Sequence, residues 1–108
     1  MTYVLYSDPG SGGATVELAL AEIGADIELR GVPLERDAQR SADYAAVNPQ
    51  RKLPTLVTPS GEVLTESAAI LITLAERHPE ARLLPPVPSP ERAQALRWLL
   101  FIAAELYP

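Results

Sequence analysis

The Leu53–Pro54 pair restricts the fold of this chain more than any other feature, because it stands where a polar run changes into an apolar strand. The residues before it, 48–52, are mostly polar, and those after it, 55–58, are typical of a strand. Proline has no backbone N–H and a fixed φ, so Pro54 is not an ordinary member of a strand ladder. We expect a cis bond here, which before proline costs only about 0.5–1 kcal/mol and turns the N–H and carbonyl of Leu53 outward. The stretch is therefore predicted to be a docking edge for a small extended peptide.

Composition limits the classes of protein to which the chain can belong. With 108 residues, of which 47% are hydrophobic and 21% charged, it is expected to form one globular domain and at most the start of a second. A net charge of −5 argues against a nucleic-acid partner, which requires a basic face. No apolar run approaches the roughly 18 residues of a membrane span, and the first residues lack the basic region of a signal peptide. We therefore expect a cytoplasmic protein.

The sequence contains no cysteine and one histidine, His78. A disulfide frame, a cysteine nucleophile and a zinc–thiolate site are excluded by the missing cysteine. A metal site is not expected with a single histidine, and His78, which stands before Pro79, is expected to end a helix without chemistry.

The periodicity of residues 3–77 predicts alternating strands and helices. Strands are expected at 3–6, 27–31, 55–58 and 63–65, and the turn 59–62 joins the last two into a hairpin. Helices are expected before Gly24, which is a typical C-terminal stop, and at 42–47 and 66–77. The order βαβα followed by ββα predicts an α/β sandwich, with a mixed four-stranded sheet and helices on both faces.

The last part of the chain has a different composition. Residues 80–90 contain Pro85, Pro86, Pro88 and Pro90 and are expected to form an extended linker. Ser89, Pro90 and Glu91 are typical of a helix start, and the helix expected at 91–107 is apolar on more than one face. A helix that packs only on its own domain does not need two apolar faces. We therefore expect a domain at 1–79, a linker at 80–90 and the first helix of an all-helical domain at 91–108.

Three motifs occur in order in the first 80 residues: Tyr-Ser-Asp-Pro-Gly-Ser at 6–11, Asn-Pro-Gln-Arg-Lys-Leu-Pro-Thr-Leu at 48–56, and Thr-Glu-Ser-Ala-Ala-Ile at 65–70. Together they resemble the N-terminal, thioredoxin-like domain of the cytosolic glutathione transferases. The resemblance implies a thioredoxin-like fold, glutathione as co-substrate, a small hydrophobic electrophile as second substrate, a role in detoxification, and a homodimer. It also implies that residues 91–108 begin the helical domain of that family.

The resemblance implies glutathione ligands in two of these motifs: Arg51, Lys52, Leu53, Pro54, Glu66 and Ser67. The main chain of Leu53 would pair with the cysteinyl unit, as in a short strand addition. Glu66 would bind the ammonium of the γ-glutamyl end, and Ser67 its carboxylate, at a helix start. Arg51 and Lys52 would meet the glycyl carboxylate. The Thr-Glu-Ser sequence is also typical of a helix cap, and we expect it to cap the helix as well as to bind.

Activation of the thiol is assigned by the resemblance to the turn at 7–13. Ser11 fits the family members in which a serine hydroxyl donates to the sulfur, and Tyr6 and Ser7 are the alternatives. A free thiol has a pKa near 8.5, and donors or a helix start lower it. The competing interpretation is a glycine-rich turn without catalytic chemistry.

Three functions are compatible with these observations. The first is a glutathione transferase, in which the bound thiolate attacks an electrophile. The second is a non-catalytic module of the same fold that binds glutathione or another protein. A glutaredoxin-like oxidoreductase shares the fold, but it needs a redox cysteine and is disfavoured.

Overall fold

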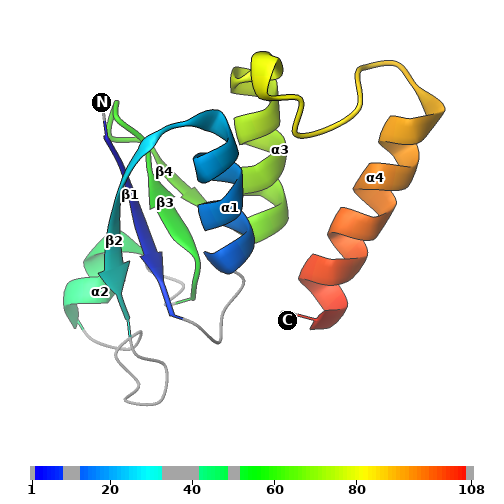
Figure 1. Cartoon of the computed structure of the whole chain (residues 1–108). Helices are drawn as coiled ribbons and strands as arrows, with labels where there is room; N and C mark the ends of the chain where they lie inside the picture. The colour runs from blue at the N-terminus through cyan, green and yellow to red at the C-terminus, as the bar shows by residue number, and fades with distance from the viewer. Residues whose placement is uncertain (1, 9–12, 33–41, 49–51, 107–108) are drawn as a thin grey trace.

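Strands and helices alternate along the chain in the predicted order (Figure 1). The computed structural model of the protein describes residues 2–8, 13–32, 42–48 and 52–106. The elements are β1 (Thr2–Ser7), α1 (Gly13–Ile23), β2 (Asp26–Gly31), α2 (Ala42–Val47), β3 (Thr55–Val57), β4 (Val63–Thr65), α3 (Ser67–Arg77) and α4 (Pro90–Phe101).

The four strands form one mixed sheet in the order β2-β1-β3-β4. β1 is parallel to β2 and antiparallel to β3, and β3 is antiparallel to β4. The register places Leu5 between Leu29 of β2 and Leu56 of β3, so that apolar side chains line up across the centre of the sheet. The predicted α/β, thioredoxin-like arrangement of a parallel pair joined to a hairpin is confirmed.

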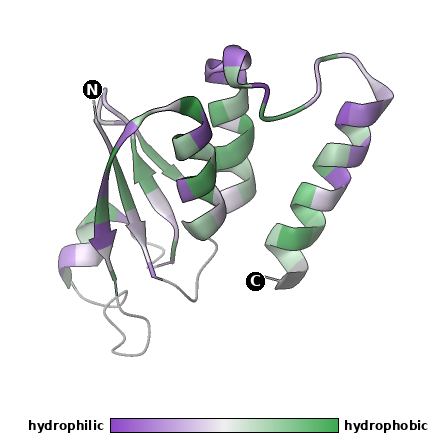
Figure 2. Cartoon of the chain, viewed as in Figure 1, coloured by the Kyte–Doolittle hydropathy of each residue, from purple (hydrophilic) through white to green (hydrophobic). Residues whose placement is uncertain are grey.

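The core lies between one face of the sheet and the helices α1 and α3, which pack against each other (Figures 1 and 2). Its buried members are Tyr3, Leu5, Val16, Ala19, Leu20, Leu56, Ile70 and Leu74. Each fully buried leucine or isoleucine contributes roughly 1.5–3 kcal/mol through the hydrophobic effect. Apolar side chains at helical spacing on α1 and α3 therefore build this core together with the central strands.

α2 packs against part of the other face of the sheet. Tyr6 follows Leu5 on β1 and points to the opposite side, since side chains alternate along a strand. Its ring packs against the ring of Tyr44 from α2, with 5.7 Å between the ring centroids. Helices thus lie on both faces, as predicted, and α2 brings Tyr44 and the following Asn48 close to the start of β3.

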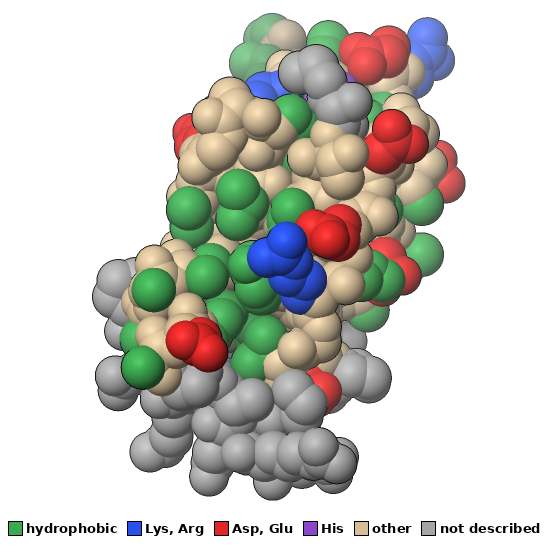
Figure 3. Space-filling model, turned by 90° about the vertical axis from the view of Figure 1, so that its left-hand side faces the viewer, with side chains coloured by type: hydrophobic (Ala, Val, Ile, Leu, Met, Phe, Trp, Pro, Cys, Tyr) green, Lys and Arg blue, Asp and Glu red, His purple; other side chains and the backbone are tan. Residues whose placement is uncertain are grey.

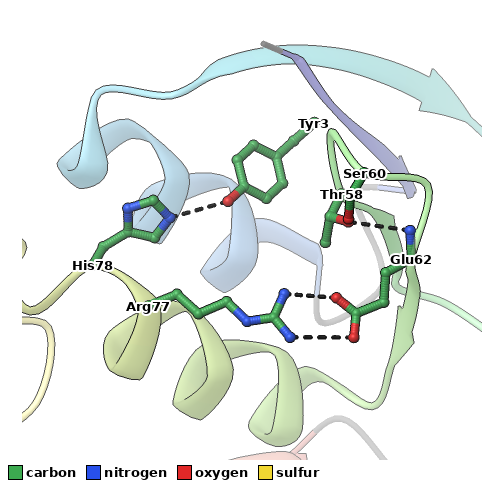
Figure 4. A network of polar contacts seen from close by, with 6 residues as sticks. All are labelled: Tyr3, Thr58, Ser60, Glu62, Arg77 and His78. Carbon is green, nitrogen blue, oxygen red and sulfur yellow. Dashed lines mark hydrogen bonds and ion pairs between the residues drawn. The ribbon is translucent and has the colours of Figure 1, made fainter.

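Local sequence explains where the elements end. α1 stops at Gly24, whose φ of 78° is readily adopted by glycine. The β3–β4 turn is closed by the Glu62 N–H, which donates to the Thr58 hydroxyl at 3.2 Å (Figure 4). The Arg77 guanidinium at the end of α3 donates to both Glu62 carboxylate oxygens, at 2.6 and 3.2 Å, and ties the helix to that turn.

A 3₁₀ turn over Pro79–Ala81 follows α3, and residues 82–89 lead from it into α4. The Ser89 hydroxyl accepts a hydrogen bond of 3.1 Å from the Arg92 N–H, which confirms the predicted cap, and a π-helical segment over Ile102–Leu106 continues the helix. α4 buries none of its residues, and Trp98, Leu100 and Phe101 are about half exposed. In the described part of the chain, no helix has the length and apolar character needed to cross a membrane.

β2 forms one edge of the sheet, and hydrophobic side chains gather on this side of the molecule (Figure 3). Leu29 of β2 and Leu18 of α1 are both more than half exposed. The carboxylate of Glu28 and the guanidinium of Arg30, 2.9 Å apart, stand on the same strand, and charged side chains of this kind protect an edge strand from pairing with another chain.

Candidate functional site

A cleft of about 460 Å³ lies between the start of β3, the start of α3 and the C-terminal part of α4. Five of the residues predicted from the sequence line it together: Lys52, Leu53, Pro54, Glu66 and Ser67. The opposite wall consists of Leu100, Ala103 and Ala104. Two motifs that are far apart in the sequence thus line one cleft. Its charged and hydroxyl side chains come from the starts of β3 and α3, and its apolar wall comes from the C-terminal part of α4.

The segment before β3 lines one side of this cleft. The Leu53–Pro54 bond is cis, as expected. Pro54 is buried, Leu53 is half-buried and Lys52 is exposed. Within the described residues, neither the N–H nor the carbonyl of Leu53 makes a hydrogen bond to the protein. A half-buried main-chain donor and acceptor without protein partners can pair with an extended ligand.

The start of α3 differs from the prediction in one respect. Glu66, the N-cap residue, makes no side-chain hydrogen bond to the helix, so the expected capping role is wrong. Its φ of 69° and ψ of 113° lie outside the regions that a residue with a side chain favours, at a cost of roughly 1–3 kcal/mol. Such backbone geometry is found often at ligand sites. Here it leaves the first-turn N–H groups of α3 without a cap from Glu66, and it presents the exposed Glu66 at the cleft.

The charges at the cleft suit a ligand that carries charges of both signs. Lys52 supplies a cation on one side and Glu66 an anion on the other, while Ser67 adds a hydroxyl at the positive end of the α3 dipole. Within the described part of the chain, no three metal-binding side chains form a group that could hold an ion. The charged side chains and the main chain of Leu53 suit charge recognition and main-chain pairing.

The candidates for thiol activation are not among the described lining of this cleft. Ser11 and Arg51 lie outside the described residues. Tyr6 lines a different hollow of about 340 Å³ on the α2 side of the sheet, and its hydroxyl accepts a hydrogen bond of 2.9 Å from Arg30. Ser7 lines a third hollow of about 420 Å³ with Asp8 and α1. Tyr6 and Ser7 thus line other hollows, although Tyr6 pairs with Thr55, the residue after Pro54, in the sheet.

A group of buried polar side chains behind the cleft was not found by the sequence analysis. Tyr44, Asn48 and Thr55 are 4%, 2% and 0% exposed, and all three contact the main-chain carbonyl of Lys52. Burial raises the pKa of Tyr44 above its ordinary value near 10, against the lowering effect of hydrogen bonds from Thr55 and Asn48, so the phenol remains a neutral donor. In the sequence, Asn48 stands before a proline, which is typical of the end of a helix and does not point to this role.

The sheet order is that of a thioredoxin-like domain, and the cleft beside it has the volume typical of small-ligand pockets. Residues 13–77 match the family of the glutathione S-transferase N-terminal domain. The glutathione S-transferase GstA of Escherichia coli O157:H7 is 38% identical over 95% of this chain and 52% of its own length. The chain belongs to the glutathione S-transferase family.

Solved structures agree with this assignment. A glutathione transferase from Methylococcus capsulatus superposes with a TM-score of 0.83 at 38% identity, covering 96% of this chain and 52% of that one. A glutathione transferase homologue from Sulfitobacter, solved with bound glutathione, gives a TM-score of 0.86 at 29% identity, with coverage of 95% and 49%. The chain thus spans about half the length of these relatives.

Proposed function

We propose that this chain is the glutathione-binding part of a glutathione transferase, and that glutathione binds in the cleft of about 460 Å³. The observation that carries the proposal is the meeting of the two predicted motifs: Leu53, whose main chain makes no hydrogen bond to the described residues, and Glu66 with Ser67 at the start of α3. Family membership and the solved homologue with bound glutathione support the choice of ligand.

Each end of the tripeptide finds a group of suitable charge. The main chain of Leu53 pairs with the cysteinyl unit, which is held in an extended form. The γ-glutamyl carboxylate lies at Ser67, where the first N–H groups of α3 favour an anion, and its ammonium lies at Glu66. Lys52, with Arg51, receives the glycyl carboxylate. These last contacts are exposed and contribute only about 0–1 kcal/mol each, so removing one of them weakens binding without abolishing it.

The thiolate is then stabilised for attack on a hydrophobic electrophile. Ser11 is the proposed donor to the sulfur, with Tyr6 and Ser7 as alternatives. Lowering a thiol pKa by about 2 units corresponds to roughly 2.7 kcal/mol of preferential thiolate stabilisation. The serine donates a hydrogen bond and the glutathione sulfur is the nucleophile. The apolar residues of α4 at the cleft, with Leu100 among them, offer a wall for the electrophile.

The organisation of the whole protein is part of the same proposal. Residues 1–79 form the glutathione-binding domain, 80–90 the linker, and 91–108 the start of a helical domain. The exposed apolar side chains of α4 support a packing partner beyond the described residues, and the protein is proposed to be a cytoplasmic homodimer that acts in detoxification. The same exposed side chains also favour a second candidate, a non-catalytic module that binds glutathione or another protein through α4.

Calorimetric titration with glutathione tests the ligand. We expect Glu66→Gln to bind severalfold more weakly, because an ion pair to an exposed carboxylate contributes up to about 1 kcal/mol. Glu76→Gln is the matched control, since it makes the same change at the other end of α3 and should bind like the wild type. Equal affinities for the wild type and Glu66→Gln would contradict the proposed site.

Thiolate absorbance in the ultraviolet separates the two candidate functions. A transferase should show thiolate at neutral pH in the complex with glutathione, lost in Ser11→Ala and retained in Tyr6→Phe. Binding without thiolate, together with no turnover of a generic aryl halide, would favour the non-catalytic module.

A further inference from the structure

Three buried side chains from different elements meet at one main-chain oxygen beside the cleft. The Lys52 carbonyl accepts hydrogen bonds from the Tyr44 hydroxyl of α2 and, at 3.1 Å, from the Asn48 amide. Thr55, the first residue of β3, contacts the same oxygen at 3.5 Å. A carbonyl with two lone pairs is thus held by two hydrogen bonds, although the Lys52 side chain itself is exposed.

The donors in this network can be assigned without leaving a hydroxyl proton unused. The single proton of the Tyr44 hydroxyl is directed to the Lys52 carbonyl, so the 2.6 Å contact between Tyr44 and Thr55 requires Thr55 to donate. The Thr55 oxygen is then free to accept from the Asn48 amide at 3.1 Å. The chain of hydrogen bonds runs from Asn48 to Thr55, to Tyr44 and to Lys52, and each of its members polarises the next.

Holding this carbonyl also fixes the direction of the neighbouring N–H. Among the described residues, the cis peptide bonds are Leu53–Pro54 and Val87–Pro88, so the Lys52–Leu53 bond is trans. The Lys52 carbonyl and the Leu53 N–H belong to the same planar peptide group, in which they point in opposite directions. When the carbonyl points into the buried network, the N–H of Leu53 must point away from it.

We propose that Tyr44, Asn48 and Thr55 are positioning residues for glutathione: by holding the Lys52 carbonyl, they aim the Leu53 N–H into the cleft. This inference rests on the proposed function, in which that N–H pairs with the cysteinyl unit. A peptide plane that is free to rotate would offer the same donor in many directions, and binding would first have to select one of them. The network makes this selection before the ligand arrives.

The first test is direct and needs no variant. In the spectrum of the ¹⁵N-labelled protein, the Leu53 amide should respond to glutathione as a hydrogen-bonded donor, with a downfield proton shift and slower hydrogen exchange. An unchanged Leu53 amide in a protein that binds glutathione would overturn the inference. A wild type that takes up no glutathione would overturn the proposed function and this inference together.

The second test removes one donor of the buried network. Tyr44→Phe deletes one donor to the Lys52 carbonyl, and we expect about tenfold weaker glutathione binding with a smaller response of the Leu53 amide. Tyr3→Phe is the matched control, because it deletes another buried tyrosine hydroxyl that bonds His78 and is remote from the cleft lining. It should bind glutathione like the wild type.

A pair of variants at Thr55 keeps the inference testable if Tyr44→Phe does not fold. Thr55→Val keeps the shape but removes the hydroxyl, and should weaken glutathione binding severalfold, whereas Thr55→Ser keeps the hydroxyl and should retain nearly wild-type affinity. Wild-type affinity in folded Tyr44→Phe or Thr55→Val would overturn the inference and leave the proposed function standing. Equal weakening in Thr55→Val and Thr55→Ser would also overturn it, since packing rather than the hydroxyl would then be responsible.

Discussion

Two buried tyrosine hydroxyls stand near opposite ends of the sheet and hold different kinds of partner. Tyr44, near the start of β3, donates to a main-chain carbonyl beside the cleft. Tyr3, at the beginning of β1, makes a hydrogen bond of 3.0 Å to Nε2 of His78, a side chain at the end of α3 (Figure 4). The first contact fixes the direction of a peptide group, whereas the second connects a strand with the end of a helix.

The partners of the two tyrosines also differ in their exposure to solvent. Asn48 and Thr55, the partners of Tyr44, are almost completely buried. At the other end, the His78 side chain is 24% exposed, and the Glu62–Arg77 ion pair beside it is nearly half exposed. Water can replace a lost partner at the exposed end but not at the buried one. The burial of a polar network, more than its number of hydrogen bonds, therefore decides what its removal costs.

The largest effect on stability is expected for Asn48→Ala. This change removes the amide that donates to both the Lys52 carbonyl and the Thr55 hydroxyl, and it leaves two buried acceptors without that partner. We expect a loss of about 2–3 kcal/mol in the free energy of unfolding, measured by urea denaturation. A loss below about 0.5 kcal/mol would contradict the claim that the buried network costs more to disrupt than the exposed one.

A smaller effect is expected for Tyr3→Phe. The hydroxyl lost is bonded to a histidine that water can reach, so the same denaturation experiment should show about 0.5–1.5 kcal/mol of destabilisation. His78→Gln offers a comparison, because the glutamine amide can also form a hydrogen bond with the Tyr3 hydroxyl. A cost for Tyr3→Phe that equals the cost of Asn48→Ala would remove the distinction between the two networks.

Much of the fold could be predicted from the sequence, because its elements have strong periodicity and clear ends. The apolar spacing of α1 and α3 and the stop at Gly24 are local properties, and they appear in the structure as predicted. Leu53 and Glu66 were placed in one site through the resemblance, and the structure brings both to one cleft.

The network behind the cleft could not be predicted in the same way. Tyr44 and Asn48 lie on or beside a short helix, and Thr55 opens a strand, so each residue has an ordinary local explanation. Their common partner is a main-chain oxygen, which no sequence pattern marks. The unusual backbone of Glu66 was missed for a related reason: the sequence Thr-Glu-Ser is typical of a cap, but the positive φ depends on how α3 joins β4.

The smallest effect is expected at the exposed end, for Glu62→Gln. The hydrogen bond from Arg77 lowers the pKa of the Glu62 carboxyl below its ordinary value. The folded state therefore gains stability from the carboxylate above the ordinary pKa near 4.3, and this gain is lost as the pH falls through the lowered pKa. Thermal unfolding at neutral pH should show a small decrease in Tm for Glu62→Gln, which fades in acid and at high salt because the pair is exposed. Glu76→Gln, with the same change of charge on the neighbouring helix, is the control. A decrease in Tm that persists unchanged in acid would assign the effect to packing of the turn, and the exposed end of the sheet would then resemble the buried end more than its ion pair suggests.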